Sequence, residues 1–178
     1  MGTMIELVKV KDAEINELSI LATKIVREHY DPIIGKAQND YMLNKFQSVE
    51  GINKQISEGY IFYWAIFNGS RAGFFSYTYK EDKLYISKLY IDKAYRGNKI
   101  ASEIIQFLTK EARKENLSKI FLNVNKRNDE TINIYKHLGF KILREEKNPI
   151  GEGFYMDDYV YELSIWWLTK KRPNLNQL

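Results

Sequence analysis

Three consecutive strand-forming segments occupy the middle of the chain, and they limit the fold more than any other feature. The first reads IFYWAIF over 61–67, the second GFFSYTY over 73–79 and the third LYISKLYI over 84–91. Residues 68–69 (Asn-Gly) and 81–82 (Glu-Asp) separate the segments, and both pairs are typical of tight turns. Strands joined by such short turns pair side by side, so we predict a three-stranded meander.

Helical spacing replaces the strand pattern shortly after Ile91. From Ile100 to Ala112 the apolar residues recur every three or four positions, which is the spacing of one face of a helix. The segment KIFLNV over 119–124 then indicates a short strand. A strand, a helix and a further strand in this order favour a parallel crossover beside the meander. We therefore predict an α/β (α+β) fold in one domain over residues 4–165, with a mixed parallel and antiparallel central sheet of about six to seven strands flanked by helices.

The segments on either side of this centre supply the remaining elements, and Met4 is a candidate start of the chain. The expected elements are a strand over 5–11, a helix that begins at Asp12 and is interrupted at Asp31-Pro32, a helical region over 39–58, a helix over 128–138, a strand that begins with residues 140–143, a loop over 148–153 and a last strand over 155–165. Residues 166–178 begin with Trp166-Trp167 and continue with a basic segment. We expect them to form a separate tail with a structural or dimer role.

Composition excludes several chemistries. The chain has 178 residues, which is the size of one ordinary domain. It contains no Cys, so disulfides, thiolate metal sites and cysteine nucleophiles are excluded. Only two His are present, so we expect no metal site built on several histidines.

The charge and hydropathy patterns limit the kinds of partner that we expect for this protein. The net charge of +4 is mild, and the basic residues are scattered among acidic ones, so we expect no nucleic-acid partner. No apolar run approaches the ~18 residues of a membrane span, and no charged-then-apolar leader is present at the start. We therefore expect a cytoplasmic protein that does not bind membranes.

The segment between the third strand and the helix has the features of an anion site. Backbone N–H groups at a helix start are unpaired, and the helix dipole adds positive potential there. Gly97 lets a phosphate approach the backbone closely, and Arg96 and Lys99 add charge. Asn98 and Ser102 can add hydrogen bonds. An ordinary strand-to-helix turn with a solvated basic loop is the other interpretation of this segment.

A second motif, about thirty residues later, favours the interpretation of this loop as an anion site. Asn128, Tyr135, Gly139 and Phe140 stand in the spacing Asn-x₆-Tyr-x₃-Gly-Phe. Together with the loop, this segment resembles the Gcn5-related N-acetyltransferase superfamily, whose pyrophosphate loop reads Gln/Arg-x-x-Gly-x-Gly/Ala and whose later helix reads Asn-x-x-Ala-x-x-x-Tyr-x-x-x-Gly-Phe. The resemblance covers nearly the whole chain, because the order of elements also matches. The departures from the pattern are Ala94, Lys99 and Thr131.

The resemblance implies acetyl-CoA as co-substrate and assigns residues to it. The main chain of 89–91 would contact the pantetheine arm, Asn128 would contact the far side of the cofactor, and Tyr135 would lie near the sulfur. A phenol with a pKa of about 10 is protonated at neutral pH, so Tyr135 could donate a proton to the leaving thiolate. The cofactor-binding residues implied are Leu89, Tyr90, Ile91, Arg96, Gly97, Asn98, Lys99, Ile100, Ala101, Ser102, Asn128 and Tyr135.

The general base remains open at this point. Many relatives carry a Glu on the strand before the pyrophosphate loop, whereas residues 84–88 here contain no carboxylate. Tyr85 or Ser87 acting through water, or a carboxylate from another segment, are the candidates. Because the chain lacks Cys, direct attack of an amine on the thioester is favoured over an acyl-enzyme.

The acceptor is suggested by the segment GEGFYMDDY over 151–159. It is similar to the Phe-Tyr-Met-rich segment of bacterial polyamine (spermidine/spermine) acetyltransferases, and carboxylates with aromatic faces suit a cationic amine. The expected acceptor-binding residues are Tyr30, Glu152, Tyr155 and Asp157. The alternatives are a small amine of another kind, a protein or peptide N-terminus, and a non-catalytic acyl-CoA-binding module. A homodimer is expected from the resemblance.

Overall fold

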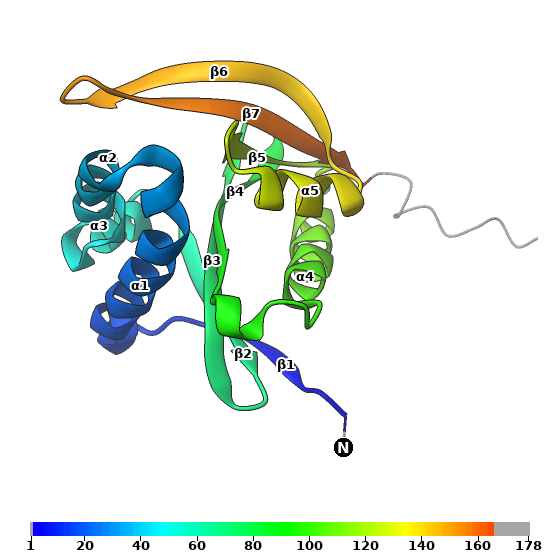
Figure 1. Ribbon diagram of the computed structural model, residues 1–178. Helices are drawn as coiled ribbons and strands as arrows, with labels where there is room; N and C mark the ends of the chain where they lie inside the picture. Colours follow the sequence, from blue (N-terminus) through cyan, green and yellow to red (C-terminus); the bar gives the residue numbers. More distant parts are fainter. Residues whose placement is uncertain (1, 166–178) are drawn as a thin grey trace, which may run out of the picture. The chain divides into compact units, whose positions relative to one another are not determined.

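Seven strands within residues 2–165, the part of the chain described by the computed structural model, belong to one mixed sheet (Figure 1). Their order is β1-β2-β3-β4-β5-β7-β6, so the predicted mixed α/β architecture is confirmed. The chain divides into two units. The first consists of the described residues up to Thr78 together with Ile86–Ile104, and the second consists of Tyr79–Tyr85 together with the described residues from Ile105. The predicted tail over 166–178 lies outside the described residues.

In the first unit one strand is followed by a group of helices and then by three consecutive strands. The elements of this unit are β1 (Ile5–Lys9), the 3-10 turn η1 (Asp12–Glu14), α1 (Ile15–Ile34), α2 (Lys36–Met42), the π-helical turn η2 (Leu43–Gln47), α3 (Val49–Ser57), β2 (Ile61–Phe67), most of β3 (Ser70–Lys80) and of β4 (Lys83–Ile91), the 3-10 turn η3 (Lys93–Tyr95) and the start of α4 (Ile100–Lys114). The second unit holds the rest of α4 with β5 (Lys119–Asn125), α5 (Asp129–His137), β6 (Lys141–Gly151) and β7 (Phe154–Ser164).

Antiparallel pairing orders the strands of the first unit. Ile5 of β1 lies opposite Phe67 of β2, and Ile61 of β2 lies opposite Tyr77 of β3. The pairing of β2 with β3 skips Ala72, which is the extra residue of a β-bulge. The bulge leaves the Ala72 carbonyl free to accept a hydrogen bond from outside this pair.

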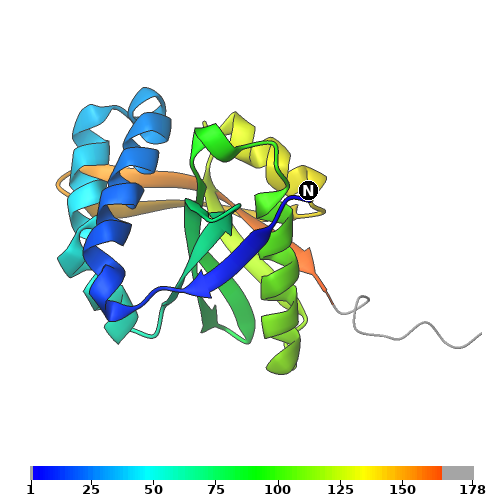
Figure 2. The same ribbon diagram turned by 90° about the horizontal axis from the view of Figure 1, so that it is seen from below.

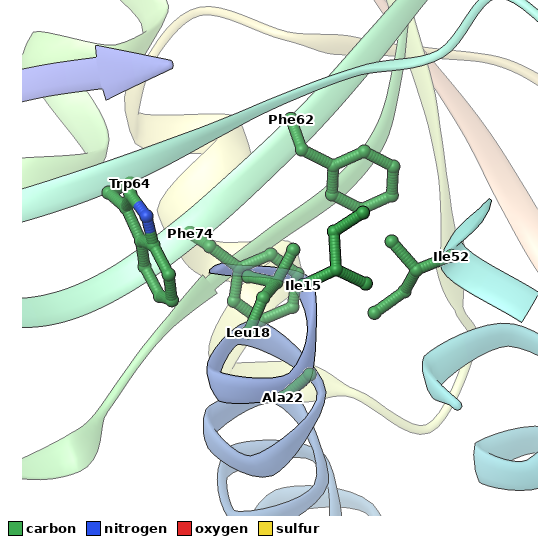
Figure 3. Packing of buried hydrophobic residues seen from close by; sticks show 7 residues of the cluster. All are labelled: Ile15, Leu18, Ala22, Ile52, Phe62, Trp64 and Phe74. Carbon is green, nitrogen blue, oxygen red and sulfur yellow. The ribbon is translucent and has the colours of Figure 1, made fainter. Parts of the chain in front are cut away.

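A hydrophobic cluster joins the helices to the strands of the first unit (Figure 3). Ile15, Leu18 and Ala22 lie three and four residues apart on α1, so they form one face of that helix. Full burial of side chains as large as Leu18 stabilises the fold by roughly 1.5–3 kcal/mol each. The cluster consists of Ile15, Leu18, Ala22, Ile52, Phe62, Trp64 and Phe74.

The helix α1 continues through Pro32, so the predicted interruption at Asp31-Pro32 is wrong. Proline removes one N–H and disfavours a helical residue before it. Asp31 nevertheless stays within the helix α1. Its carboxylate accepts a hydrogen bond from Asn39 at 2.7 Å, and its carbonyl accepts one from the Gly35 N–H at 3.1 Å. The bond from Asn39 comes from the next helix, α2, and it stabilises Asp31 at the position before the proline.

The predicted helical region over 39–58 is two helices joined by the π-helical turn. Ser48 ends that turn and caps α3, since its hydroxyl accepts a hydrogen bond from the Gly51 N–H at 3.0 Å. In Figure 2 the helices α1, α2 and α3, coloured blue to cyan, lie side by side.

A long hairpin of β6 and β7 dominates the second unit (Figure 1). The predicted loop over 148–153 is largely wrong, because β6 extends to Gly151 and Asn148 pairs with Met156. Pro149 is accommodated because β6 is the last strand in the sheet order, and an edge strand has one side with no ladder hydrogen bonds to make. The register also shifts between Pro149 and Gly151. Within residues 2–165 no helix is both long and apolar enough to cross a membrane.

Candidate functional site

The segment after β4 forms an open turn that leads into α4. Gly97 has a φ of +82° and Lys99 a φ of +62°, and α4 begins at Ile100. The first hydrogen bond along the helix runs from the Glu103 N–H to the Lys99 carbonyl at 3.1 Å. The N–H groups of residues 100–102 therefore precede the helical ladder, as an anion site requires.

The surroundings of Gly97 leave room for a ligand. A Cβ built on Gly97 would meet no heavy atom within 4 Å. Its positive φ is a conformation that glycine adopts without steric cost and other residues adopt rarely. The expected cradle for a pyrophosphate is thus compatible with the observed backbone, and Arg96 and Lys99 flank it in the sequence.

Two side chains of this segment have partners inside the loop. The Asn98 side-chain amide donates to the Tyr95 carbonyl at 2.8 Å, and the Arg96 Nε donates to the Ile91 carbonyl at 3.4 Å. The Asn98 bond fixes the turn that precedes Gly97. Asn98 therefore shapes the loop in this structure, while Arg96 retains its positive charge beside the helix start.

Asp92 anchors the beginning of the loop, a role that sequence reasoning missed. The residue is 5% exposed, and its carboxylate accepts from the Lys24 Nζ at 2.9 Å and the Ala94 N–H at 3.1 Å. Its own N–H donates to the carbonyl of Ala72, the bulge residue of β3, at 2.8 Å. Burial alone would raise the pKa of Asp92, but the bonds from Lys24 and Ala94 outweigh it and lower the pKa.

We expect Asp92→Asn to lower the midpoint of thermal unfolding by a few degrees at pH 7. The amide keeps the bond from Ala94 but loses the ion pair with the half-exposed Lys24. Because folding lowers the pKa of Asp92, its contribution is complete above the unfolded value of about 3.9 and is lost as the pH falls through the lowered value. A double-mutant cycle with Lys24→Met measures the pair. Additive effects of the two substitutions would contradict the coupling.

The end of β4 carries the residues expected to contact the pantetheine arm. Leu89, Tyr90 and Ile91 are all partly buried there. The Tyr90 ring lies edge-on to Tyr30 of α1, with 6.2 Å between ring centroids, and 5.5 Å from the Phe74 ring. The structure therefore brings Tyr30, expected at the acceptor, next to Tyr90 within the first unit.

A second residue that sequence reasoning missed is Lys88 of β4. It is 6% exposed, its Nζ donates to the Gln55 Oε1, and the same Nζ lies 5.6 Å from the centroid of the Phe62 ring. Burial lowers the pKa of Lys88 to about 7. The alternation of Leu84, Ile86 and Lys88 on one face of the strand was a signal that could have identified it.

We expect Lys88→Met to raise the free energy of unfolding at pH 7 by about 1–3 kcal/mol, because an ammonium no longer has to lose its charge on folding. Between pH 7 and the ordinary lysine value of 10.5, the unfolded wild type binds more protons than the folded one. Its stability therefore rises with pH in this window, and the rise is absent in Lys88→Met. Urea unfolding from pH 6.5 to 9.5 measures both effects. Lys54→Met, at an exposed position of α3, is the control; equal pH dependence in all three proteins would contradict the prediction.

In the second unit, Asn128 lies directly before α5 and Tyr135 lies in its last turn. Asn128 is buried and caps the helix, since its Oδ1 accepts from the Thr131 N–H at 3.4 Å. Tyr135 is 5% exposed, and its ring lies edge-on to Phe140 with 5.2 Å between centroids. Asn128 thus has a structural role in addition to the expected contact with the cofactor.

The predicted acceptor residues of the second unit do not form one cluster. Glu152 lies in the turn between β6 and β7, whereas Asp157 lies further along β7 and its carboxylate pairs with the Lys126 Nζ at 3.0 Å. Tyr155 is 50% exposed, and the Lys147 Nζ lies 5.2 Å from its ring centroid. Lys126 therefore pairs with the charge of Asp157, and Lys147 lies over the ring of Tyr155.

The carboxylate of Asp158, in β7 of this hairpin, is buried. Burial raises its pKa to about 6, while a hydrogen bond from Asn123 lowers the pKa, and the charges of Asp157 and Glu146 raise it further. Asn123 also donates to Glu146 at 3.3 Å, so one amide holds two acidic groups. Among the residues that the structure describes, no group of three or more His, Cys, Asp or Glu side chains is placed to hold a metal ion.

The chain is similar to known proteins in sequence and in fold. The model of the acetyltransferase (GNAT) family matches residues 24–140. No curated protein sequence matches the chain. Among solved structures, the PaiA N-acetyltransferase of Thermoplasma acidophilum in complex with coenzyme A is 19% identical, with a TM-score of 0.75, over 90% of this chain and 99% of that one. The ribosomal-protein-S18-alanine N-acetyltransferase of Escherichia coli is 17% identical, with a TM-score of 0.65, over 97% and 99% of the two chains.

Proposed function

The chain belongs to the acetyltransferase (GNAT) family, and on that premise we propose that it transfers the acetyl group of acetyl-CoA to a primary amine of a small cationic molecule, with polyamines as the first candidates. The N-acetyltransferase activity and the use of acetyl-CoA follow from the family. The choice of acceptor is the proposal, and the contact between Tyr30 and Tyr90 carries it.

The aromatic pair supports a small cationic acceptor. Tyr30 and Tyr90 are both partly buried, and the His29 ring lies edge-on to Tyr30 with 4.8 Å between centroids. Phenol rings attract ammonium groups through their faces, and the attraction is stronger where water is partly excluded. A primary ammonium on a short aliphatic chain matches such a surface in charge and in size.

The loop of the first unit would hold the co-substrate. The N–H groups of residues 97–102 would bind the pyrophosphate, with Arg96 and Lys99 adding charge, and the main chain of Leu89 and Ile91 would bind the pantetheine arm. Acetyl-CoA supplies an activated thioester. In the second unit, Asn128 would bind a polar group of the co-substrate, and the Tyr135 hydroxyl would donate the proton that the leaving thiolate needs. The chain has no Cys, so direct attack by the amine is proposed.

Release of CoA thiol from acetyl-CoA tests the acceptor. The panel consists of spermidine, spermine, diamines, short peptides and aminoglycosides, and the protein adds no thiol background because it lacks Cys. Release with polyamines and diamines alone supports the proposal. Release with peptides alone would replace it with a peptide or protein N-terminus as acceptor. Binding of acetyl-CoA without release would favour a non-catalytic binding module.

We expect Gly97→Val to raise the Kd for acetyl-CoA at least tenfold, because the side chain would occupy the space in which a phosphate approaches the backbone. Gly69→Val is a matched control. Gly69 has a φ of +84° and, like Gly97, no heavy atom within 4 Å of a built Cβ, but it lies in the turn between β2 and β3. Both variants place valine at a similar positive φ. An equal Kd in the two variants would place the pyrophosphate elsewhere.

A further inference from the structure

The proposed transfer needs a group that accepts a proton from the acceptor amine. An alkylamine with a pKa of about 10.4 is mostly an ammonium at neutral pH, so one proton must leave before or during the attack. The strand β4 has no carboxylate. It contains instead one lysine that the fold buries almost completely, Lys88.

The partner of Lys88 is fixed by bonds of its own. The side-chain Nε2 of Gln55 donates to the Phe46 carbonyl at 2.8 Å and to the Gly51 carbonyl at 2.9 Å. Both protons of this amide are thereby used, so Oε1 must be the atom that faces Lys88. The Phe46 carbonyl belongs to the π-helical turn η2, a type of irregularity that is frequent at functional sites.

This environment suits a neutral amine better than an ammonium. An ammonium has three N–H donors, whereas Gln55 Oε1 is the one hydrogen-bond acceptor that Lys88 contacts among residues 2–165. The other close group is the ring of Phe62, and burial is the cause of the lowered pKa, with no charged group acting on it. A neutral amine can donate to Gln55 and keep its lone pair available.

The position of Lys88 along β4 places it beside the proposed acceptor surface. Residues two apart on a strand lie on the same face and about 7 Å apart, so Lys88 and Tyr90 are neighbours on one face of β4. The Tyr90 ring contacts Tyr30 on that face. An amine bound at these tyrosines would be within reach of a four-carbon side chain.

We propose that Lys88 is the proton acceptor of the acetyl transfer, an inference that rests on the proposed function. The amine nitrogen forms a bond to the acetyl carbon while the bond from that carbon to sulfur breaks. The surplus proton of the amine nitrogen passes to the lone pair of the Lys88 Nζ. The thiolate takes a proton from Tyr135 or from water, and the second proton that the nitrogen loses as the amide forms restores the Tyr135 phenol or the water. Lys88 returns its proton to solvent after each turnover.

Two measurements test the role. The first is the pH profile of kcat for the best amine of the panel in wild type, Lys88→Met and Lys88→Arg, with Lys54→Met as control. We expect both Lys88 variants to lose about 100-fold or more in kcat and to lack the acidic limb near pH 7, while the Kd for acetyl-CoA stays unchanged. Lys54→Met is expected to keep the wild-type profile.

The second measurement is an NMR titration of the wild-type protein labelled with ¹³C at lysine Cε, with the Lys88 signal assigned from its absence in Lys88→Arg. A midpoint near pH 7 is expected, and it requires neither catalysis nor a folded Lys88→Met. A midpoint near 10, or an acidic limb that persists in both variants, would overturn the role of Lys88. A wild type that releases CoA from no amine would overturn the proposed function and this role together, whatever the midpoint.

Discussion

Replacing Tyr135 with phenylalanine is expected to lower kcat by about 100-fold or more and to leave the Kd for acetyl-CoA nearly unchanged. The substitution keeps the ring, which is buried and lies edge-on to Phe140, and removes only the hydroxyl. General acids contribute roughly 10²–10⁴-fold to the rates of proton-dependent steps. An effect on kcat without an effect on binding indicates a group that acts in the transition state.

Tyr161→Phe provides the matched control for this experiment. Tyr161 is also a buried tyrosine of the second unit, and its hydroxyl has no hydrogen-bond partner among the described residues. Its loss is therefore expected to leave kcat unchanged. Steady-state kinetics with the best amine of the panel compare the two variants. Equal kcat values in Tyr135→Phe and Tyr161→Phe would remove Tyr135 from the role of acid.

Replacing Gly73 with alanine is expected to lower the free energy of unfolding by about 3 kcal/mol or more. A Cβ built on Gly73 would lie 2.2 Å from the Tyr90 carbonyl oxygen and 3.0 Å from the Ile91 Cα. Both atoms belong to backbone, so β3 and β4 would have to separate within the first unit. The entropic gain of a glycine-to-alanine change, roughly 0.4–1 kcal/mol, is too small to offset overpacking of this kind.

Urea unfolding of Gly73→Ala, compared with Ser76→Ala in the same strand, measures this effect. Ser76 is fully buried, and its hydroxyl has no partner among residues 2–165, so its removal is expected to change the free energy of unfolding by less than about 1 kcal/mol. Because Tyr90 and Ile91 lie at the expected pantetheine site, any folded Gly73→Ala should also bind acetyl-CoA more weakly. Two variants of equal stability would contradict the close approach.

Replacing Lys88 is expected to change both the stability and the activity of the protein. Its replacement by methionine is expected to stabilise the fold and to reduce turnover, because a buried amine costs free energy whether or not it performs chemistry. Opposite changes in the two properties are typical of residues retained for function rather than for packing. A purely structural lysine would give no pH-dependent change in kcat.

Much of the architecture could be predicted from local patterns. The segments over 61–67 and 73–79 alternate and end in turn residues, and the structure pairs them as antiparallel strands. The helical face from Ile100 was likewise predicted, since a 3.6-residue period is a property of a short stretch of chain. The family itself was suggested by motifs of this local kind and then shown by the match over residues 24–140.

The remaining features depend on residues that are distant in the sequence. The bond between Lys88 and Gln55 joins positions 33 residues apart, and the ion pair of Lys24 with Asp92 joins positions 68 residues apart. The sequence by itself determined most of the segments that become strands and helices, because short-range sterics and periodicity control local structure. Only the tertiary structure decided that Lys88 is buried beside a neutral amide, since the water removed from a side chain depends on every element that packs around it.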